Sequence, residues 1–206
     1  MRSGAKALAV ACAAASAMAT STPGEAQPIV DGQAPTGAAS TLKRLYTAAA
    51  IPLNIVLPPV DASEKAALAA GSKDQPLQIG FGRAIPAAYQ GDLQPLLQWV
   101  PEADGTATAV VAVTSPGAQA LRVALDVTDL PGGVELRFFS LAQPAQVFGP
   151  FTARDMRQAS KDANAPRTPY WSPVIEGETV GVELRRTQAA RQVGFVLKIA
   201  RVSHIV

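Results

Sequence analysis

Apolar and polar side chains alternate along much of the chain, most regularly after residue 120. The most regular stretches are 121–127, 134–138, 180–184 and 193–199. Less regular apolar stretches are 51–56, 77–85, 96–100, 106–114 and 147–151. A period of two is typical of a β-strand that turns one face to the core and the other to solvent. The pattern therefore predicts an all-β fold, an antiparallel β-sandwich of the jelly-roll type.

Proline, glycine and polar residues separate these stretches and predict their connections. Leu130-Pro131-Gly132-Gly133 lies between 121–127 and 134–138, and we expect these two strands to form a hairpin. A polar tip at 186–191 is expected to join the last two strands. The charged stretch 152–168 predicts a loop with at most one helical turn.

One or two short helices are expected near the N-terminus. Residues 40–50 carry apolar side chains spaced for one side of a short helix. Asp61 is placed to cap a second helix over 63–70, with Glu64 in its first turn and Gly71 just past its end.

The N-terminal residues have the layout of a secretory signal peptide. Arg2 and Lys6 precede the apolar run 7–15, and small residues follow as cleavage candidates. The run is too short to span a bilayer, so we expect no membrane span. We expect export to the periplasm or the extracellular space. The predicted organisation is a signal peptide over 1–26, a flexible leader over 27–50 and one β-sandwich domain over 51–206.

Cysteine content and charge narrow the classes of partner. Cys12 is the only cysteine and lies inside the predicted signal peptide, so the mature chain would have no disulfide. Lipoprotein processing at Cys12 is an alternative, but it would leave a very short apolar stretch. Charged residues make up 17% of the chain and the net charge is +2, so there is no strong basic field and nucleic acid is not an expected partner.

No residue pattern predicts catalysis. His204 is the only histidine, and neither Gly-x-Ser-x-Gly nor Gly-Asp-Ser-Gly accompanies it, so we expect a structural role for it. Glu176 and Glu178 flank Gly177, which describes a solvated turn more simply than a catalytic carboxylate pair. We therefore predict no catalytic residue, no metal ligand and no cofactor. Whether the chain belongs to an enzyme stays open.

A proline-rich corner is the most distinctive structural motif. Its members are Trp171, Ser172, Pro173, Glu176, Gly177 and Glu178. Proline fixes extended backbone before the turn, and we expect Trp171 to be buried as a plug at one end of the sandwich. The alternative is a sugar-stacking platform made of Trp171 with Tyr89, Trp99 and Tyr170.

The charged stretch 152–168 is a candidate processing loop. Its basic residues are Arg154, Arg157, Lys161 and Arg167. Exposed and weakly packed loops are the sites where proteases cut folded domains. The simpler interpretation is a solvated loop whose charges maintain solubility.

Several short segments resemble those of a known family. They are 76–83, 148–151, 170–173, 176–178 and 182–184. Together they resemble the non-catalytic, propeptide-like N-terminal region of secreted bacterial trypsin-like serine endopeptidases of the lysyl endopeptidase type, over about residues 53–205. The resemblance implies an accessory domain that lies between signal peptide and protease domain in a precursor. It also implies a partner, either that protease domain or another extracellular protein.

None of the catalytic residues of such peptidases has a counterpart in this chain. A free-standing secreted binding module for carbohydrate or protein is the alternative interpretation of the same residues.

Overall fold

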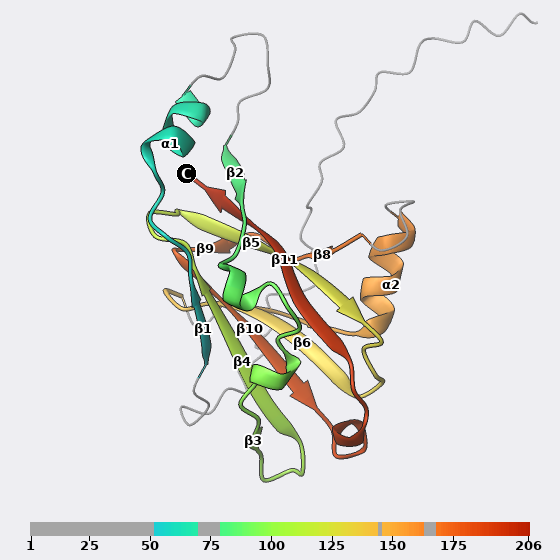
Figure 1. The fold of residues 1–206 in the computed structure, drawn as a ribbon. Helices are drawn as coiled ribbons and strands as arrows, with labels where there is room; N and C mark the ends of the chain where they lie inside the picture. The colour runs from blue at the N-terminus through green and yellow to red at the C-terminus, as the bar shows by residue number, and fades with distance from the viewer. Residues whose placement is uncertain (1–51, 70–78, 144–145, 163–167) are drawn as a thin grey trace, which may run out of the picture. The chain divides into compact units, whose positions relative to one another are not determined.

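Two β-sheets pack against each other in the computed structural model, which describes residues 52–69, 79–143, 146–162 and 168–206 (Figure 1). The strands of sheet A are β1 (Leu53–Val56), β3 (Val100–Pro101), β4 (Ala107–Thr114), β6 (Val134–Ser140), β7 (Val147–Phe151) and β10 (Thr179–Arg186). Their order is β1-β4-β10-β6-β7, and β3 also pairs with β4. All these pairs are antiparallel except β1 with β4.

Sheet B is built around the last strand of the chain. Its strands are β2 (Gly80–Arg83), β5 (Ala120–Thr128), β8 (Tyr170–Trp171), β9 (Ile175–Glu176) and β11 (Val196–Ile205). Their order is β2-β11-β5-β8, and β9 pairs with β5 as well. Every pair in this sheet is antiparallel. The prediction of an all-β sandwich is confirmed.

One apolar core lies between the sheets. Side chains at every second position of the long strands enter it, as the alternation predicts. In β5 these side chains are Leu121, Val123 and Leu125; in β10 they are Val180, Val182 and Leu184. Each of them is at most 2% exposed. Burial of this apolar surface is the main force that holds the two sheets together.

The predicted hairpin of 121–127 with 134–138 is wrong. β5 belongs to sheet B, where β11, β8 and β9 are its neighbours, whereas β6 belongs to sheet A beside β10 and β7. Leu130-Pro131-Gly132-Gly133 therefore carries the chain across the core from one sheet to the other. The connection at 187–195 does the same between β10 and β11. Alternation specifies which face of a strand is buried, but it does not specify which strand lies beside it.

Helix α1 (Ala62–Ala69) confirms the second predicted helix and its cap. The Asp61 Oδ1 atom accepts the Glu64 backbone N–H at 2.8 Å, and the Glu64 Oε2 atom accepts the Asp61 backbone N–H at 3.0 Å. This reciprocal pair is a capping box, which satisfies two backbone donors at the helix start. The predicted helix over 40–50, the signal peptide over 1–26 and the leader over 27–50 lie outside the described residues.

Helix α2 (Ala153–Asp162) replaces most of the predicted loop at 152–168. Thr152 donates its backbone N–H and its hydroxyl to the Asp155 Oδ2 atom, each at 2.7 Å, so a second capping arrangement begins this helix. Met156 is only 9% exposed and packs into the core from the first turns of the helix. The prediction of a loop is therefore wrong for residues 153–162.

Smaller differences concern strand length and short 3₁₀ turns. The predicted strand 96–100 is instead η2 (Gln94–Leu96) followed by the two-residue β3. The predicted tip at 186–191 contains η3 (Ala189–Gln192), and η1 (Ala87–Tyr89) follows β2. Among the residues that the structure describes, no helix has the length and apolar character needed to cross a membrane.

Candidate functional site

The corner that begins at Trp171 is held to β5 by Ser172. The Ser172 backbone N–H donates to the Val123 carbonyl at 2.9 Å, and the Ser172 Oγ atom accepts the Val123 N–H at 3.0 Å. The same hydroxyl donates to the Pro173 carbonyl at 2.8 Å, and the side chain is fully buried. A side-chain oxygen thus takes the place of a backbone carbonyl where the chain turns away from the sheet.

The turn at Glu176-Gly177-Glu178 joins three segments of the chain. Gly177 has a φ of +99°, which disfavours any side chain at this position, and its N–H donates to the Gln119 carbonyl at 2.7 Å. Glu178 accepts the Gly117 N–H at 2.8 Å, and the Glu176 carbonyl accepts the Ser140 hydroxyl at 2.6 Å. These contacts describe a structural corner.

Trp171 does not plug the end of the sandwich. It is half-buried, and the Arg122 guanidinium lies 5.4 Å from the centre of its ring. Its neighbour Tyr170 packs on the core instead, beside Phe138 and Phe151 at ring-centre distances of 6.3 and 5.5 Å. Adjacent residues of a strand point to opposite faces, so only one of the two aromatic side chains can face the core. Burial raises the pKa of Tyr170, and the nearby Asp155 carboxylate adds to this shift.

His204 belongs to a buried polar cluster of Arg83, Ser115 and His204. The Ser115 Oγ atom lies 2.8 Å from the His204 Nδ1 atom and accepts an Arg83 Nη1–H at 3.0 Å. Burial lowers the pKa of His204 below its ordinary value of 6.5, and the Arg83 charge lowers it further. Ser115 and His204 are 0% and 1% exposed, so no substrate reaches this serine–histidine pair. Its geometry is that of a structural network.

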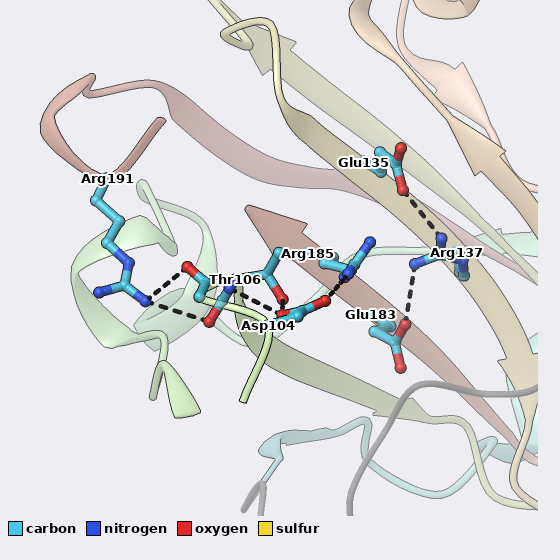
Figure 2. Close-up of polar contacts among 8 residues, drawn as sticks. Asp104, Thr106, Glu135, Arg137, Glu183, Arg185 and Arg191 are labelled. Atoms are coloured by element: carbon cyan, nitrogen blue, oxygen red, sulfur yellow. Dashed lines mark hydrogen bonds and ion pairs between the residues drawn. The ribbon is translucent and has the colours of Figure 1, made fainter. Parts of the chain in front are cut away.

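A network of ion pairs and hydrogen bonds organises the charged side chains around β10 (Figure 2). Arg137 lies between Glu135 and Glu183, at N···O distances of 2.9 and 3.4 Å. Arg185 pairs with Asp104 in the turn before β4. Arg191 donates to the carbonyls of Gly105 and Thr106, at 3.2 Å each. Arg185 and Arg191 thus hold the 104–106 turn, while Arg137 and Arg185 each lie beside their own carboxylate partners.

A groove of about 730 Å³ lies between α2 and the C-terminal end of β5. Figure 1 shows α2 beside this end of β5 and next to β8. The apolar side of the groove comes from Val127, Leu130, Met156 and Tyr170, and its polar rim comes from Asp126, Asp129, Arg157, Ser160 and Lys161. Within the described ranges, no three His, Cys, Asp or Glu side chains gather as a metal site requires.

Three of the four predicted processing residues belong to α2. Arg154, Arg157 and Lys161 are exposed on this helix, and the last two line the groove. Arg167 lies outside the described residues. The structure thus brings these basic residues onto one helix rather than onto a loop. Sequence reasoning missed the opposite wall, since nothing local to Val127 or Asp129 indicates that α2 lies across from them.

Comparison with known proteins identifies the family of this chain. A family model described as the lysyl endopeptidase N-terminal domain matches residues 56–206. The lysyl endopeptidase of Pseudomonas aeruginosa is 32% identical over 187 residues, which cover 86% of this chain and 38% of that protein. The chain therefore matches well under half of the length of this relative. No solved structure matches the chain. The chain belongs to the lysyl endopeptidase N-terminal domain family.

Proposed function

We propose that this chain is an exported, non-catalytic N-terminal region of a lysyl endopeptidase precursor and that it acts by contact with the protease domain. The observation that carries the proposal is the family match over residues 56–206, which extends from the end of β1 to the end of β11. The matched part thus contains every strand of the sandwich except Leu53–Ile55 of β1, together with nearly all of its core. Such a domain can fold around its own apolar residues and present a surface to a partner.

The titratable residues support a non-catalytic role. His204 and Ser115 are buried in a structural network, and Glu176 and Glu178 serve the corner. General acid–base and nucleophilic catalysis both need such groups within reach of a substrate. Ser115 and His204 do not meet that condition, and the exposed carboxylates of Glu176 and Glu178 form hydrogen bonds that hold the corner.

Export is the second part of the proposal. It is supported by Arg2 and Lys6 before the apolar run 7–15, the layout of a cleaved signal peptide. Expression of residues 1–206 in a Gram-negative host tests it: N-terminal sequencing of the periplasmic product should find a start at or before residue 27. A product that keeps Met1 and stays in the cytoplasm would contradict export.

Processing within α2 is the third part. Arg154, Arg157 and Lys161 are exposed to solvent, as a basic-specific protease requires. A helix does not fit the extended cleft of a protease, so cleavage there needs local unfolding of α2. The short helix and its capping residues therefore set how easily the site opens.

The decisive experiment concerns the contact with a protease domain. The coding sequence beyond Val206 is determined, and the encoded downstream part is refolded with and without residues 27–206. We expect a protease domain whose recovered activity, or whose inhibition after folding, depends on the added chain. A stop codon after Val206, together with no effect on the protease domain of the Pseudomonas relative, would favour the free-standing binding module.

A further inference from the structure

The backbone N–H and C=O of Val127, at one edge of β5, have no hydrogen-bond partner within the described part of the chain. β5 pairs with β11 along residues 120–128 on one edge. On its other edge it pairs only with β9, at Ala120 and Leu121, and with β8, at Ala124 and Leu125. β8 thus ends opposite Leu125, and Asp126, Val127 and Thr128 have no paired strand on that side among the described residues. Thr168, two residues before β8, lines the same groove.

The direction of the Val127 backbone follows from the residue that faces it on β11. Leu197 is opposite Val127, but its N–H donates to the Asp92 Oδ1 atom at 2.9 Å, and its carbonyl accepts the Leu93 N–H at 2.8 Å. The N–H and C=O of Leu197 therefore point away from β5, and Leu197 and Val127 form a non-hydrogen-bonded pair of the antiparallel ladder. The N–H and C=O of Val127 consequently point to the opposite edge, into the groove beside α2.

Val123 supports the same orientation from four residues upstream. Its N–H and C=O both bond to Ser172, on the edge that β8 extends. Residues an even number apart in a regular strand point their backbone groups to the same side, so Val127 repeats the direction of Val123. No hydrogen-bond partner for the Val127 backbone lies among the described residues.

The walls of the groove suit a strand that lies along this edge. Below it, Val127, Leu130 and Met156 offer an apolar floor. Across from it, Arg157 and Lys161 bring donors that can reach carbonyl oxygens on the outer edge of an added strand, whereas the Ser160 hydroxyl already donates to the Met156 carbonyl at 3.2 Å. On the side of β5, the exposed carboxylates of Asp126 and Asp129 flank Val127.

We propose that this groove binds a short extended segment of a partner protein, which adds to sheet B beside Val127. The segment carries one apolar side chain, placed over the floor, next to one basic side chain that pairs with Asp126 or Asp129. Backbone pairing gives such strand addition its affinity, and the pockets for alternate side chains give it specificity. Arg157 and Lys161 on the far wall disfavour a run of several basic residues in the segment.

The proposal is tested on residues 27–206 with synthetic peptides. The probe is fluorescein-labelled Thr-Val-Lys-Thr with both ends blocked, and its comparison is the same peptide with Glu in place of Lys. Fluorescence anisotropy gives the dissociation constants. We expect the Lys peptide to bind several-fold more tightly than the Glu peptide, and added salt to reduce the difference.

Substitutions at Val127 separate backbone pairing from side-chain contact. Val127→Pro removes the N–H that faces the groove, and we expect binding to weaken about tenfold, as the loss of one hydrogen bond implies. Val127→Thr keeps the N–H and the branched shape and is the matched control, expected to bind like the parent. Ser160→Trp places a large side chain in the groove from the side of α2 and should also weaken peptide binding. It is the second test variant, used if Val127→Pro does not fold.

Amide hydrogen exchange tests the proposal on the parent chain, without any substitution. The Val127 amide should exchange much faster than that of Val123, and saturating peptide should slow it. Undiminished binding to folded Val127→Pro, equal binding of both peptides or no binding at millimolar peptide would each overturn the proposal. Self-association that Ser160→Trp abolishes would overturn it as well, since the occupant would then be a second copy of the chain.

The outcome is separable from the proposed function. Peptide binding needs no protease domain, so it can succeed while the refolding experiment fails. Conversely, the Ser160→Trp variant could still assist refolding of the protease domain as the parent chain does. That result would support the proposed function and would place the contact with the protease domain outside this groove.

Discussion

The central strands of the two sheets differ in how completely they are paired. β10 has β4 on one side over Thr179–Arg186 and β6 on the other over Val180–Arg186. β5 is paired with β11 along its length, but within the described ranges its second edge has only the two-residue strands β8 and β9. Sheet A is thus closed around its centre, whereas sheet B keeps a gap where α2 lies. The difference makes the end of β5 the place where the proposed partner segment would add to the sandwich.

Removal of core volume from β10 should have the largest effect. Leu184 is fully buried, and Leu184→Ala should cost about 2–5 kcal/mol of unfolding free energy through lost packing and the cavity left behind. Val127→Ala, at the half-buried edge of β5, should cost about 1 kcal/mol. Chemical denaturation of both variants measures the difference. Equal costs would contradict the contrast between the closed sheet and the open one.

Loss of the Ser172 hydroxyl should have the next largest effect. Ser172→Ala leaves the Val123 N–H buried without its acceptor, which should cost about 1–3 kcal/mol. Ser203→Ala, on the outer face of neighbouring β11, is the control and should change stability by less than about 0.5 kcal/mol. Thermal unfolding of the two variants is the measurement. A neutral Ser172→Ala would mean that the corner does not depend on this side-chain acceptor.

Lowering the pH should reduce the free energy of unfolding through His204, which lies on β11 of sheet B. The pKa of His204 lies below its ordinary value of 6.5 in the folded chain, so the folded state binds fewer protons than the unfolded state as the pH falls from 6.5. Stability from this group is complete above about pH 6.5 and is lost as the pH falls toward the folded pKa. The loss cannot exceed about 1.4 kcal/mol per pH unit for one proton.

Unfolding curves at pH 7.5, 6.5 and 5.5 measure this slope. The non-titrating variant His204→Gln should be less stable at every pH and should show a flatter dependence. A parent chain whose stability stays constant between pH 7.5 and 5.5 would show that protonation of His204 is not linked to folding.

Loss of the α2 cap should have the smallest effect on global stability and a local effect on cleavage. Thr152→Ala removes the hydroxyl that bonds Asp155 and should cost about 1 kcal/mol, chiefly by opening the helix. Brief trypsin digestion should then cut at Arg154 or Arg157 sooner than in the parent, with Thr128→Ala as the exposed control. Mass spectrometry identifies the first fragments. First cuts confined to 185–191 in both chains would contradict a processing role for α2.

Sequence alone predicted the sandwich because alternation reports the buried face of each strand directly. It could not pair the strands: β5 and β6 have the same pattern whether they lie side by side or face each other across the core. It also could not choose between Tyr170 and Trp171 for the inward position, since both are large aromatic residues. The start of α2 could have been predicted, because Thr152 and Asp155 have the spacing of a capping box. The polar composition of this stretch led to the prediction of a loop instead.

The candidate groove was beyond local sequence patterns. Its two walls, Val127 and Ser160, are separated by the whole of β6, β7 and half of α2, and only the tertiary fold brings them together. The Arg83, Ser115 and His204 cluster is similar in this respect, because its members come from three distant segments. The hydrogen-bond partners of His204 and of the 176–178 corner could not be predicted either, because they lie far away in the sequence.

The crossing of the chain between sheets also bears on when the domain can form during synthesis. In sheet B, β11 lies between β2 and β5, and it ends at Ile205. A ribosome or translocation channel that releases the chain from its N-terminus therefore delivers β2 and β5 long before the strand that joins them. Until then these strands must stay unpaired on that side, exposed to other chains and to chaperones. Distant pairing of this kind makes folding slow, and here it makes folding wait for the last ten residues of the domain.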